Sequence, residues 1–431
     1  MTEKIINLLK SNAATSKQLQ LATGYSQAVV SRKLRKLGDK VITLDQQRPP
    51  QYLLSGDAFG VGNKVPISLT NHDGELCLVG FLRPIKPKGF YYESNDKTSK
   101  VLLGGNKGLF TDLPYYLDDL RPQGFLGRQI AKKMSRISEE FPTKSSYWNS
   151  NQIGRFIIAN NDDLTGNIAL GEQPLLRLKK KPKTTKRSEY ATIANEIMQG
   201  EIFGSSAGGE QPKFTAFNHE LQSHVIVKFS PKGESEIAHR WRDVLLSEHH
   251  ANQALNSISV EAAQTHVFEQ GGRLFLESIR FDRKSMFGKC PMISLQAIDS
   301  EFVGSGENWL KTGQKLVQLK LMQVQYLSTI KLLSAFGSLI NNTDMHLGNL
   351  SLTFNNKEFK PLPIYDMCSM GFAPKASEVH AFSFTPSPIK SLELEDNEEV
   401  KIKRAIGCFW KGLANDKRLS KEFRKFIKAH P

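Results

Sequence analysis

The chain has 431 residues and a formal net charge of +15, because 58 Lys and Arg outnumber 43 Asp and Glu. Its hydrophobic fraction of 39% excludes disordered and fibrous proteins, and its length suits roughly two to four domains. No apolar run reaches the roughly 20 residues of a membrane-spanning helix and no secretory signal opens the sequence, so we expect a cytoplasmic protein without a membrane partner.

The first 57 residues have the pattern of a winged helix-turn-helix. Apolar residues recur at helical spacing before Gly24, which should end a helix, and Ser26 is a favourable N-cap for the next one. The apolar runs 41–44 and 52–54 predict two strands that flank a wing.

Basic side chains cluster on the helix that follows Ser26. Arginine and small polar residues off its apolar side are the types that donate to base edges and phosphates in a major groove. The alternative is a small helical domain for protein contacts with a solvated basic face, but the clustering favours DNA. The candidate DNA-binding residues are Ser26, Gln27, Ser31, Arg32, Arg35 and Arg48.

Residues 58–175 alternate apolar and polar positions with many glycines, which predicts short antiparallel strands. Phe156–Ile158 is one expected strand, and Asp162 and Asp163 are expected in the turn that follows it. No catalytic motif is evident in this region. The run 177–187 has seven basic residues and no acid, and it predicts a flexible linker.

The four cysteines lie far apart without a CxxC pair, which argues against a zinc site or a disulfide scaffold. We expect buried thiols at all four positions, which are Cys77, Cys290, Cys368 and Cys408.

Residues suited to phosphate chemistry follow position 200. A loop of small residues at 204–213 would let backbone N–H groups approach a phosphate. A β-rich run then ends at Lys228, and Glu248 lies in the next helical stretch. A strand lysine and a helix glutamate form the ion pair that positions nucleotide phosphates in protein kinases.

A second group of residues continues this order. The apolar helical stretch 327–340 leads to Asp344 and Asn349, which are five positions apart, and a later strand leads to Asp366. In the protein-kinase catalytic loop, this Asp accepts the substrate hydroxyl proton and this Asn binds magnesium. Each residue alone would be an ordinary surface residue, but together they occur in kinase order.

These residues resemble the HipA family of serine/threonine kinase toxins over about residues 60–431. Ordinary protein kinases fit less well, because Asp344 follows Asn-Thr instead of His-Arg and Asp366 precedes Met-Cys instead of Phe-Gly. The fused N-terminal module resembles the YjjJ-type members. The segments that carry the resemblance are Ser205–Gly209, Lys228, Arg280–Arg283, Asn342–Asn349 and Tyr365–Asp366.

The resemblance implies an α+β, protein-kinase-like fold of the HipA type, two-lobed, with an N-terminal β-rich subdomain and an appended winged helix-turn-helix. The implied domains are the winged module 1–57, the β-rich subdomain 58–175 and the kinase domain 176–431. Within the kinase domain, the small lobe spans about 188–284 and the helical lobe about 285–431.

The resemblance also implies ATP and Mg²⁺ as cofactors. Asp344 would be the catalytic base, with His346 bracing its loop, and Asn349 and Asp366 would bind magnesium. Lys228, oriented by Glu248, would join the ATP-binding residues. The implied ATP-binding residues are Ser206, Ala207, Gly208, Gly209, Lys213, Lys228 and Phe281, and autophosphorylation at Ser205 or Ser206 would switch the kinase off.

The leading interpretation is a kinase toxin that inhibits growth by phosphorylating a protein, by family analogy an aminoacyl-tRNA synthetase. Residues 1–57 would bind DNA, and the fusion would replace a separate antitoxin. The first alternative is a DNA-binding transcriptional regulator with a weak or inactive kinase-like domain. The second is a magnesium-dependent nuclease that uses Asp344, His346 and Asp366.

Overall fold

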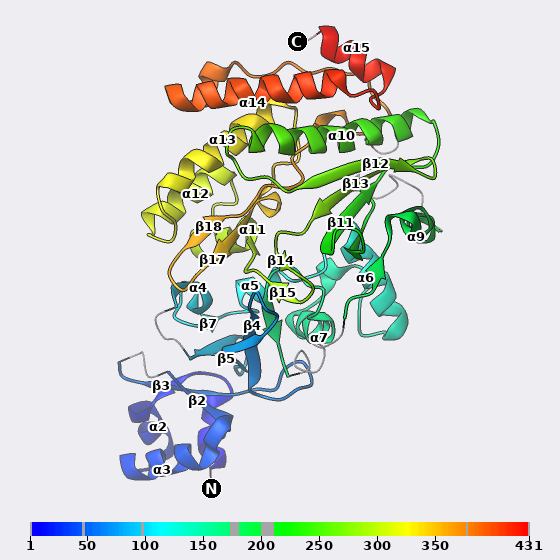
Figure 1. Ribbon diagram of the computed structural model, residues 1–431. Helices are drawn as coiled ribbons and strands as arrows, with labels where there is room; N and C mark the ends of the chain where they lie inside the picture. Colours follow the sequence, from blue (N-terminus) through cyan, green and yellow to red (C-terminus); the bar gives the residue numbers. More distant parts are fainter. Residues whose placement is uncertain are drawn as a thin grey trace.

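A computed structural model describes residues 2–44, 48–95, 99–172, 181–199, 211–375 and 378–429. In Figure 1 the N-terminal module lies at one end of the molecule and the C-terminal helices lie at the other. A β-rich region and a five-stranded sheet lie between them, so the predicted α+β architecture is confirmed. Among the described residues, no helix combines the length and the apolar character needed to cross a membrane.

In its described part, the N-terminal module contains three short helices and a three-stranded antiparallel sheet, with the helices and two of the strands in the positions that the sequence predicted for a winged helix-turn-helix. Gly24 ends its second helix with a φ of 74°, a left-handed conformation that favours glycine, and Ser26 occupies the N-cap position of the third without a side-chain cap bond. Both predicted wing strands are confirmed. The elements are α1 (Glu3–Leu9), β1 (Ala14–Thr15), α2 (Ser16–Thr23), α3 (Gln27–Leu37), β2 (Val41–Leu44) and β3 (Gln51–Leu54).

This module has its own small core and a separate junction to the rest of the chain. Buried side chains from all three helices form one cluster, with Leu19 and Val30 fully buried. On the other side of the wing, Ile42 and Leu53 pack against Ile85 and Tyr91. The wing therefore attaches the module to the middle region.

The middle region, residues 58–172, is built on an antiparallel sheet in the strand order β7-β6-β5-β4-β8. Its strands are β4 (Val65–Thr70), β5 (Leu76–Pro84), β6 (Phe90–Ser94), β7 (Leu109–Phe110) and β8 (Ile168–Leu170). Its helices are α4 (Lys100–Leu103), α5 (Tyr115–Asp118), α6 (Gly124–Ile137) and α7 (Ser150–Asn160).

The strand predicted at Phe156–Ile158 is wrong, because these residues lie in α7. The local signals for a helix outweigh the β-rich composition. Asn149 and Gln152 form a capping box, and buried Ile153 lies three positions before Phe156.

A second five-stranded sheet follows, in the strand order β12-β13-β11-β10-β9. Its strands are β9 (Thr184–Thr185), β10 (Lys213–Asn218), β11 (Ser223–Phe229), β12 (Thr265–Gln270) and β13 (Arg273–Ile279). Helix α9 (Tyr190–Met198) and hairpin strands β14 (Arg283–Lys284) and β15 (Gly288–Lys289) accompany it.

The linker predicted at 177–187 is wrong for its described part, 181–187. Thr184–Thr185 pairs in parallel with β10, and Arg187 forms an ion pair with the buried carboxylate of Glu277. The pairing with β10 and the ion pair with buried Glu277 thus hold this stretch in place. The charge pattern of the sequence around 177–187 could reveal neither contact. Residues 177–180 lie outside the described residues.

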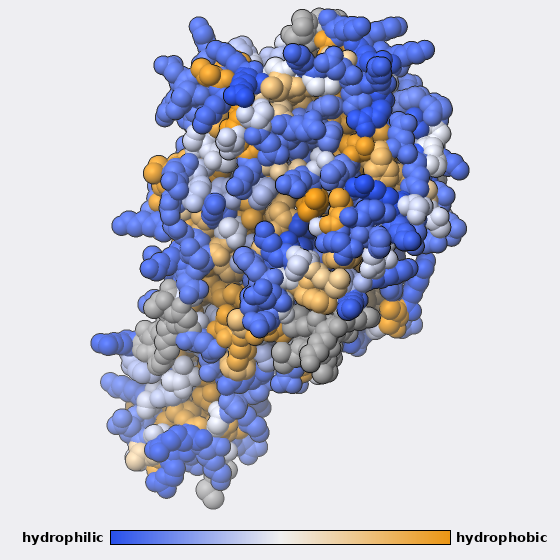
Figure 2. Space-filling view, in the orientation of Figure 1, coloured by the Kyte–Doolittle hydropathy of each residue, from blue (hydrophilic) through white to orange (hydrophobic). Residues whose placement is uncertain are grey.

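The C-terminal half is mainly helical. The long helix α10 (Glu236–Asn256) lies along the sheet in Figure 1, and the helices α13 (Gln325–Leu339) and α14 (Asp396–Asn415) pack beside it around a core that includes Leu245, Phe336 and Phe409. Figure 2 shows mostly hydrophilic side chains over the two ends of the molecule. The remaining elements are α11 (Leu295–Ile298), α12 (Trp309–Gln318), α15 (Lys421–Ala429), β16 (Ile293–Ser294), β17 (Ser351–Phe354) and β18 (Phe359–Pro361).

The cysteine prediction is correct at two positions and wrong at two. Cys290 and Cys368 are buried, whereas Cys77 and Cys408 are exposed. Cys77 occupies an outward position of β5, and Cys408 lies on the solvent side of α14, so neither can reach a core.

The core of the N-terminal module gives a first prediction. Leu19→Ala should lower the free energy of unfolding by about 2–5 kcal/mol, because it leaves a cavity at a fully buried position. Hydrogen exchange of the full chain should then speed up in α2 and α3. The control is Leu21→Ala on the same helix, where the side chain is 77% exposed. Equal exchange in the two variants would contradict the assigned core.

Candidate active site

Lys228, near the end of β11, lies between two carboxylates. Its Nζ donates to Glu248 Oε1 on α10 at 2.6 Å and also donates to Asp366 Oδ1. Lys228 is 5% exposed and Glu248 is 2% exposed, so the pair is shielded from water. The fold therefore brings together the strand lysine, the helix glutamate and the later aspartate that the sequence singled out.

The charges of this cluster stabilise one another. Burial alone would lower the pKa of Lys228, but the carboxylates of Asp366 and Glu248 outweigh it and raise that pKa well above its ordinary value. Burial alone would raise the pKa of Asp366, and Lys228 and Lys213 reverse this and hold it well below its usual range. Lysine and aspartate are thus both charged at neutral pH.

A second lysine faces the same carboxylate. Lys213 is the register partner of Lys228 across β10 and β11, and its Nζ lies 3.9 Å from Asp366 Oδ2. Asp366 has a φ of 54°, in the left-handed region that aspartate seldom adopts. Backbone strain of this kind is concentrated at functional sites. The turn after β18 therefore fixes the direction of this carboxylate.

The loop from Asn341 to Asn349 is held by its own polar side chains. Asn342 Oδ1 accepts the backbone N–H of Asp344 at 3.0 Å, and Asn349 Nδ2 donates to the carbonyl of Asp344 at 2.7 Å. His346 Nδ1 accepts the N–H of Gly348 at 3.1 Å, and its Nε2 lies 3.8 Å from Asp344 Oδ1. These contacts bring Asp344, His346 and Asn349 together in one turn.

An aromatic pair lies beside the aspartate. The ring centroids of Phe281 and Tyr365 are 5.9 Å apart, and the Tyr365 hydroxyl bonds to Ser351 Oγ at 2.7 Å and to the carbonyl of Gly348 at 3.1 Å. Tyr365 therefore connects the Asp366 turn to the loop that carries Asp344.

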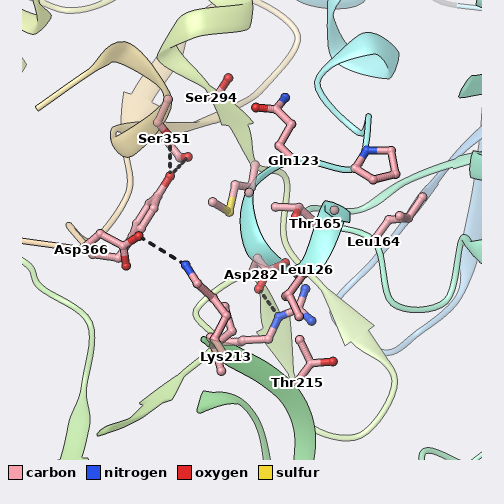
Figure 3. A pocket seen from close by; sticks show the side chains of 18 of the residues that line it. Gln123, Leu126, Leu164, Thr165, Lys213, Thr215, Asp282, Ser294, Ser351 and Asp366 are labelled. Carbon is pink, nitrogen blue, oxygen red and sulfur yellow. Dashed lines mark hydrogen bonds and ion pairs between the residues drawn. The ribbon is translucent and has the colours of Figure 1, made fainter. Parts of the chain in front are cut away.

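These groups open into a cavity of about 680 Å³. Six of the predicted catalytic, ATP-binding and metal-binding residues line it. Asp344 and Asn349 do not line it but lie next to His346, which does: the His346 carbonyl accepts the N–H of Asn349 at 3.0 Å, and His346 Nε2 lies 3.8 Å from Asp344 Oδ1. Figure 3 shows Lys213 and Asp366 facing each other in this cavity. The six lining residues are Lys213, Lys228, Glu248, Phe281, His346 and Asp366.

The middle region also lines the cavity, which the sequence did not indicate. Gln123, Leu126, Leu164 and Thr165 lie across the view from Asp366 in Figure 3. Leu126 belongs to the first turn of α6, and the other three lie in loops. The sequence predicted a helix that begins at Leu126 and a turn that includes Asp163, but neither signal indicated a binding site.

Other predicted site residues lie elsewhere. The six candidate DNA-binding residues are exposed on the N-terminal module, at the opposite end of the molecule from the C-terminal helices. Five predicted phosphate-loop residues, Ser205, Ser206, Ala207, Gly208 and Gly209, lie outside the described residues.

Oxygen donors suited to a hard cation are available at two positions. Asp366 supplies a charged carboxylate, and the Oδ1 of Asn349 accepts no hydrogen bond from a described residue. Within the described ranges, no group of three or more His, Cys, Asp or Glu side chains is arranged for a metal ion. Two protein oxygens fit magnesium, which commonly completes its shell with phosphate and water.

Comparison with known proteins places these residues in a family context. Residues 61–179 match the model of the YjjJ-like toxin middle domain, and residues 205–428, just over half of the chain, match that of the HipA-like C-terminal domain. The "Toxin YjjJ" of Escherichia coli (strain K12) is 30% identical over 447 residues, which cover 99% of this chain and 96% of that protein.

A solved structure has a similar fold. It is HipA of the Shewanella oneidensis MR-1 toxin–antitoxin system, in a complex with HipB and operator DNA. The TM-score is 0.55 with 15% sequence identity, and the match covers 85% of this chain and 94% of that one.

The buried ion cluster gives a second prediction. Lys228→Met should lower the free energy of unfolding by about 3–5 kcal/mol at pH 7, because it leaves buried carboxylates without their cation. Without Lys228 the pKa values of these carboxyls should rise, so the loss should shrink as the pH falls toward 5 and they take up protons. Urea unfolding at several pH values measures this.

Two further variants control for this result. Lys311→Met, which removes an exposed pair with Glu307, should change stability by less than about 1 kcal/mol. Lys228→Met combined with Glu248→Gln should recover part of the loss. A Lys228→Met effect no larger than that of Lys311→Met would contradict the cluster.

Proposed function

This chain belongs to the HipA-like toxin family, and from this membership we propose that it is an ATP- and magnesium-dependent serine/threonine protein kinase. The proposal rests on the position of Lys228, which is paired with Glu248 and Asp366 and lines a cavity. The loop that contains Asp344 and Asn349 lies next to this cavity. This arrangement places two lysines, Lys228 and Lys213, near the two oxygen donors Asp366 and Asn349, where phosphate groups and a divalent cation could bind together.

The lysines would bind ATP through its phosphates. Lys228 and Lys213 line the cavity and supply positive charge there, and Glu248 fixes the position of the Lys228 ammonium group. Asp366 and Asn349 would hold magnesium, which neutralises phosphate charge when it is bound. Phe281 and the neighbouring ring of Tyr365 provide an apolar surface for a base.

Asp344 would act on the acceptor. Its carboxylate is half exposed, and Asn349 fixes its loop, so it can accept the proton of a serine or threonine hydroxyl. The hydroxyl oxygen then bonds to the γ-phosphorus while the bond to the ADP oxygen breaks. His346 has its Nδ1 committed to the loop backbone, which suits a bracing role.

The acceptor would be a protein whose phosphorylation inhibits growth, in keeping with the toxin family. An aminoacyl-tRNA synthetase stays a prediction from resemblance, because no described residue identifies one. Autophosphorylation at Ser205 or Ser206 also stays a prediction, since both lie outside the described residues.

The N-terminal module would bind DNA. Its α3 presents Arg32 and Arg35 to solvent, and exposed Ser31 lies beside them. The solved HipA structure contains HipB and operator DNA. In this chain the fused module would supply the DNA contact itself, without a separate antitoxin.

Loss of the base gives the third prediction. Asp344→Asn should reduce phosphoryl transfer from ATP to protein by about 10²–10⁴-fold and leave ATP binding nearly unchanged, because the amide cannot accept the proton. Radiolabelled ATP transfer and calorimetry measure the two effects. Asp396→Asn, at the exposed start of α14, is the control. Full transfer by purified Asp344→Asn protein would show that another group is the base.

DNA binding gives the fourth prediction. Arg32→Ala and Arg35→Ala should each weaken binding to a duplex from the promoter of the chain's own gene, and each should reduce the salt slope by about 1. Fluorescence anisotropy at several salt concentrations measures this, with Lys4→Ala on α1 as the control. A wild type that binds promoter and shuffled duplexes equally would rule out operator recognition.

A further inference from the structure

One aspartate of the middle region, Asp163, bonds to two parts of the kinase-like half. Asp163 Oδ1 accepts from Arg280 Nη1 at 2.9 Å, and its Oδ2 accepts from Thr215 Oγ1 of β10 at 2.9 Å. Arg280 follows β13 and is almost fully buried. One side chain of the middle region therefore bridges two separate parts of the sheet that carries Lys213 and Lys228.

Arg280 is itself held firmly. Its Nε and Nη2 donate to the two carboxylate oxygens of Asp282 at 3.0 and 2.9 Å. Asp282 also accepts the backbone N–H of Gly166 at 3.0 Å, and this residue again belongs to the middle region. The turn at 161–167 is thus anchored to the sheet by charged and backbone contacts.

A second junction joins the middle region to the C-terminal half of the chain. Asp119 of the middle region accepts the backbone N–H of Ser294 at 2.8 Å, at the start of α11. The segment 119–127, which begins at this junction, and the turn 163–165 both line the cavity. Two separate junctions, at Asp163 and at Asp119, therefore hold the middle region against the same cavity.

We infer that the middle region forms a third wall of the nucleotide pocket, in addition to the two kinase-like lobes, and that Asp163 is one of the residues that position it. The inference rests on the proposed ATP binding. Asp163 touches Arg280 and Thr215, not the groups assigned to phosphate transfer, so it acts on the shape of the pocket through them. Its loss should weaken nucleotide binding and leave the chemistry intact.

The adjacent aspartate provides a matched control. Asp162 is exposed, and its side chain forms no hydrogen bond or ion pair with a described residue. Asp163→Ala should weaken binding of ATP with magnesium about tenfold, whereas Asp162→Ala should change it by less than about twofold. Calorimetry on the full-length protein measures both, and thermal unfolding checks that both variants remain folded.

Two further variants test the wall from other sides. Thr215→Val keeps the shape of the side chain and removes one contact to Asp163, so it should weaken ATP binding in the same direction. Leu126→Trp enlarges a half-buried side chain that faces the cavity and should also weaken binding, without disturbing the ion pairs. Either variant keeps the inference testable if Asp163→Ala fails to fold.

A kinetic measurement separates positioning from a merely structural role. In Asp163→Ala the KM for ATP should rise about tenfold while kcat at saturating ATP stays near the wild-type value. If the wild-type protein binds ATP and both Asp163→Ala and Leu126→Trp bind it as tightly as the wild type does, the third wall is wrong but the proposed function stands. A wild type that binds no ATP would overturn both this inference and the proposed function.

Discussion

The buried ion cluster of Lys228 with Glu248 and Asp366 is the interaction on which the site depends. It joins β11, α10 and the turn after β18, three segments that no continuous stretch of chain brings together. Charges are expensive to bury unless they are paired, so each of these groups is held where the others can meet it. The same cluster places the Lys228 ammonium group in the lining of the cavity, where it can exchange a carboxylate for a phosphate.

A second buried ion cluster serves the surroundings of the site. Arg280, Asp282 and Arg283 lie where the chain leaves the sheet, and all three bond to the turn 161–167 or to one another. The Lys228 cluster places charged groups in the lining of the cavity. The Arg280 cluster holds the turn 161–167 of the middle region against that cavity. The middle region is in this sense part of the site and not a passive neighbour of the kinase-like half.

The sequence predicted the features that depend on local pattern. Gly24 and Ser26 mark the helix-turn-helix, and the spacing of Asp344 and Asn349 marks the loop, because turn geometry and loop length are local properties. The contact of Asp163 with Arg280 spans 117 residues and has no local signature. The strand misread at Phe156–Ile158 shows the same limit, since the helix there is decided by a cap at Asn149 outside the β-branched run.

The most direct test is a crystal structure of the full-length protein with magnesium and a non-hydrolysable ATP analogue. We expect phosphate oxygens on Lys228 and Lys213, and magnesium on Asp366 and Asn349. We also expect Lys228 to keep its contact with Glu248. An analogue bound elsewhere, with the contact between Lys228 and Asp366 intact, would contradict the assignment of this cavity as the nucleotide site.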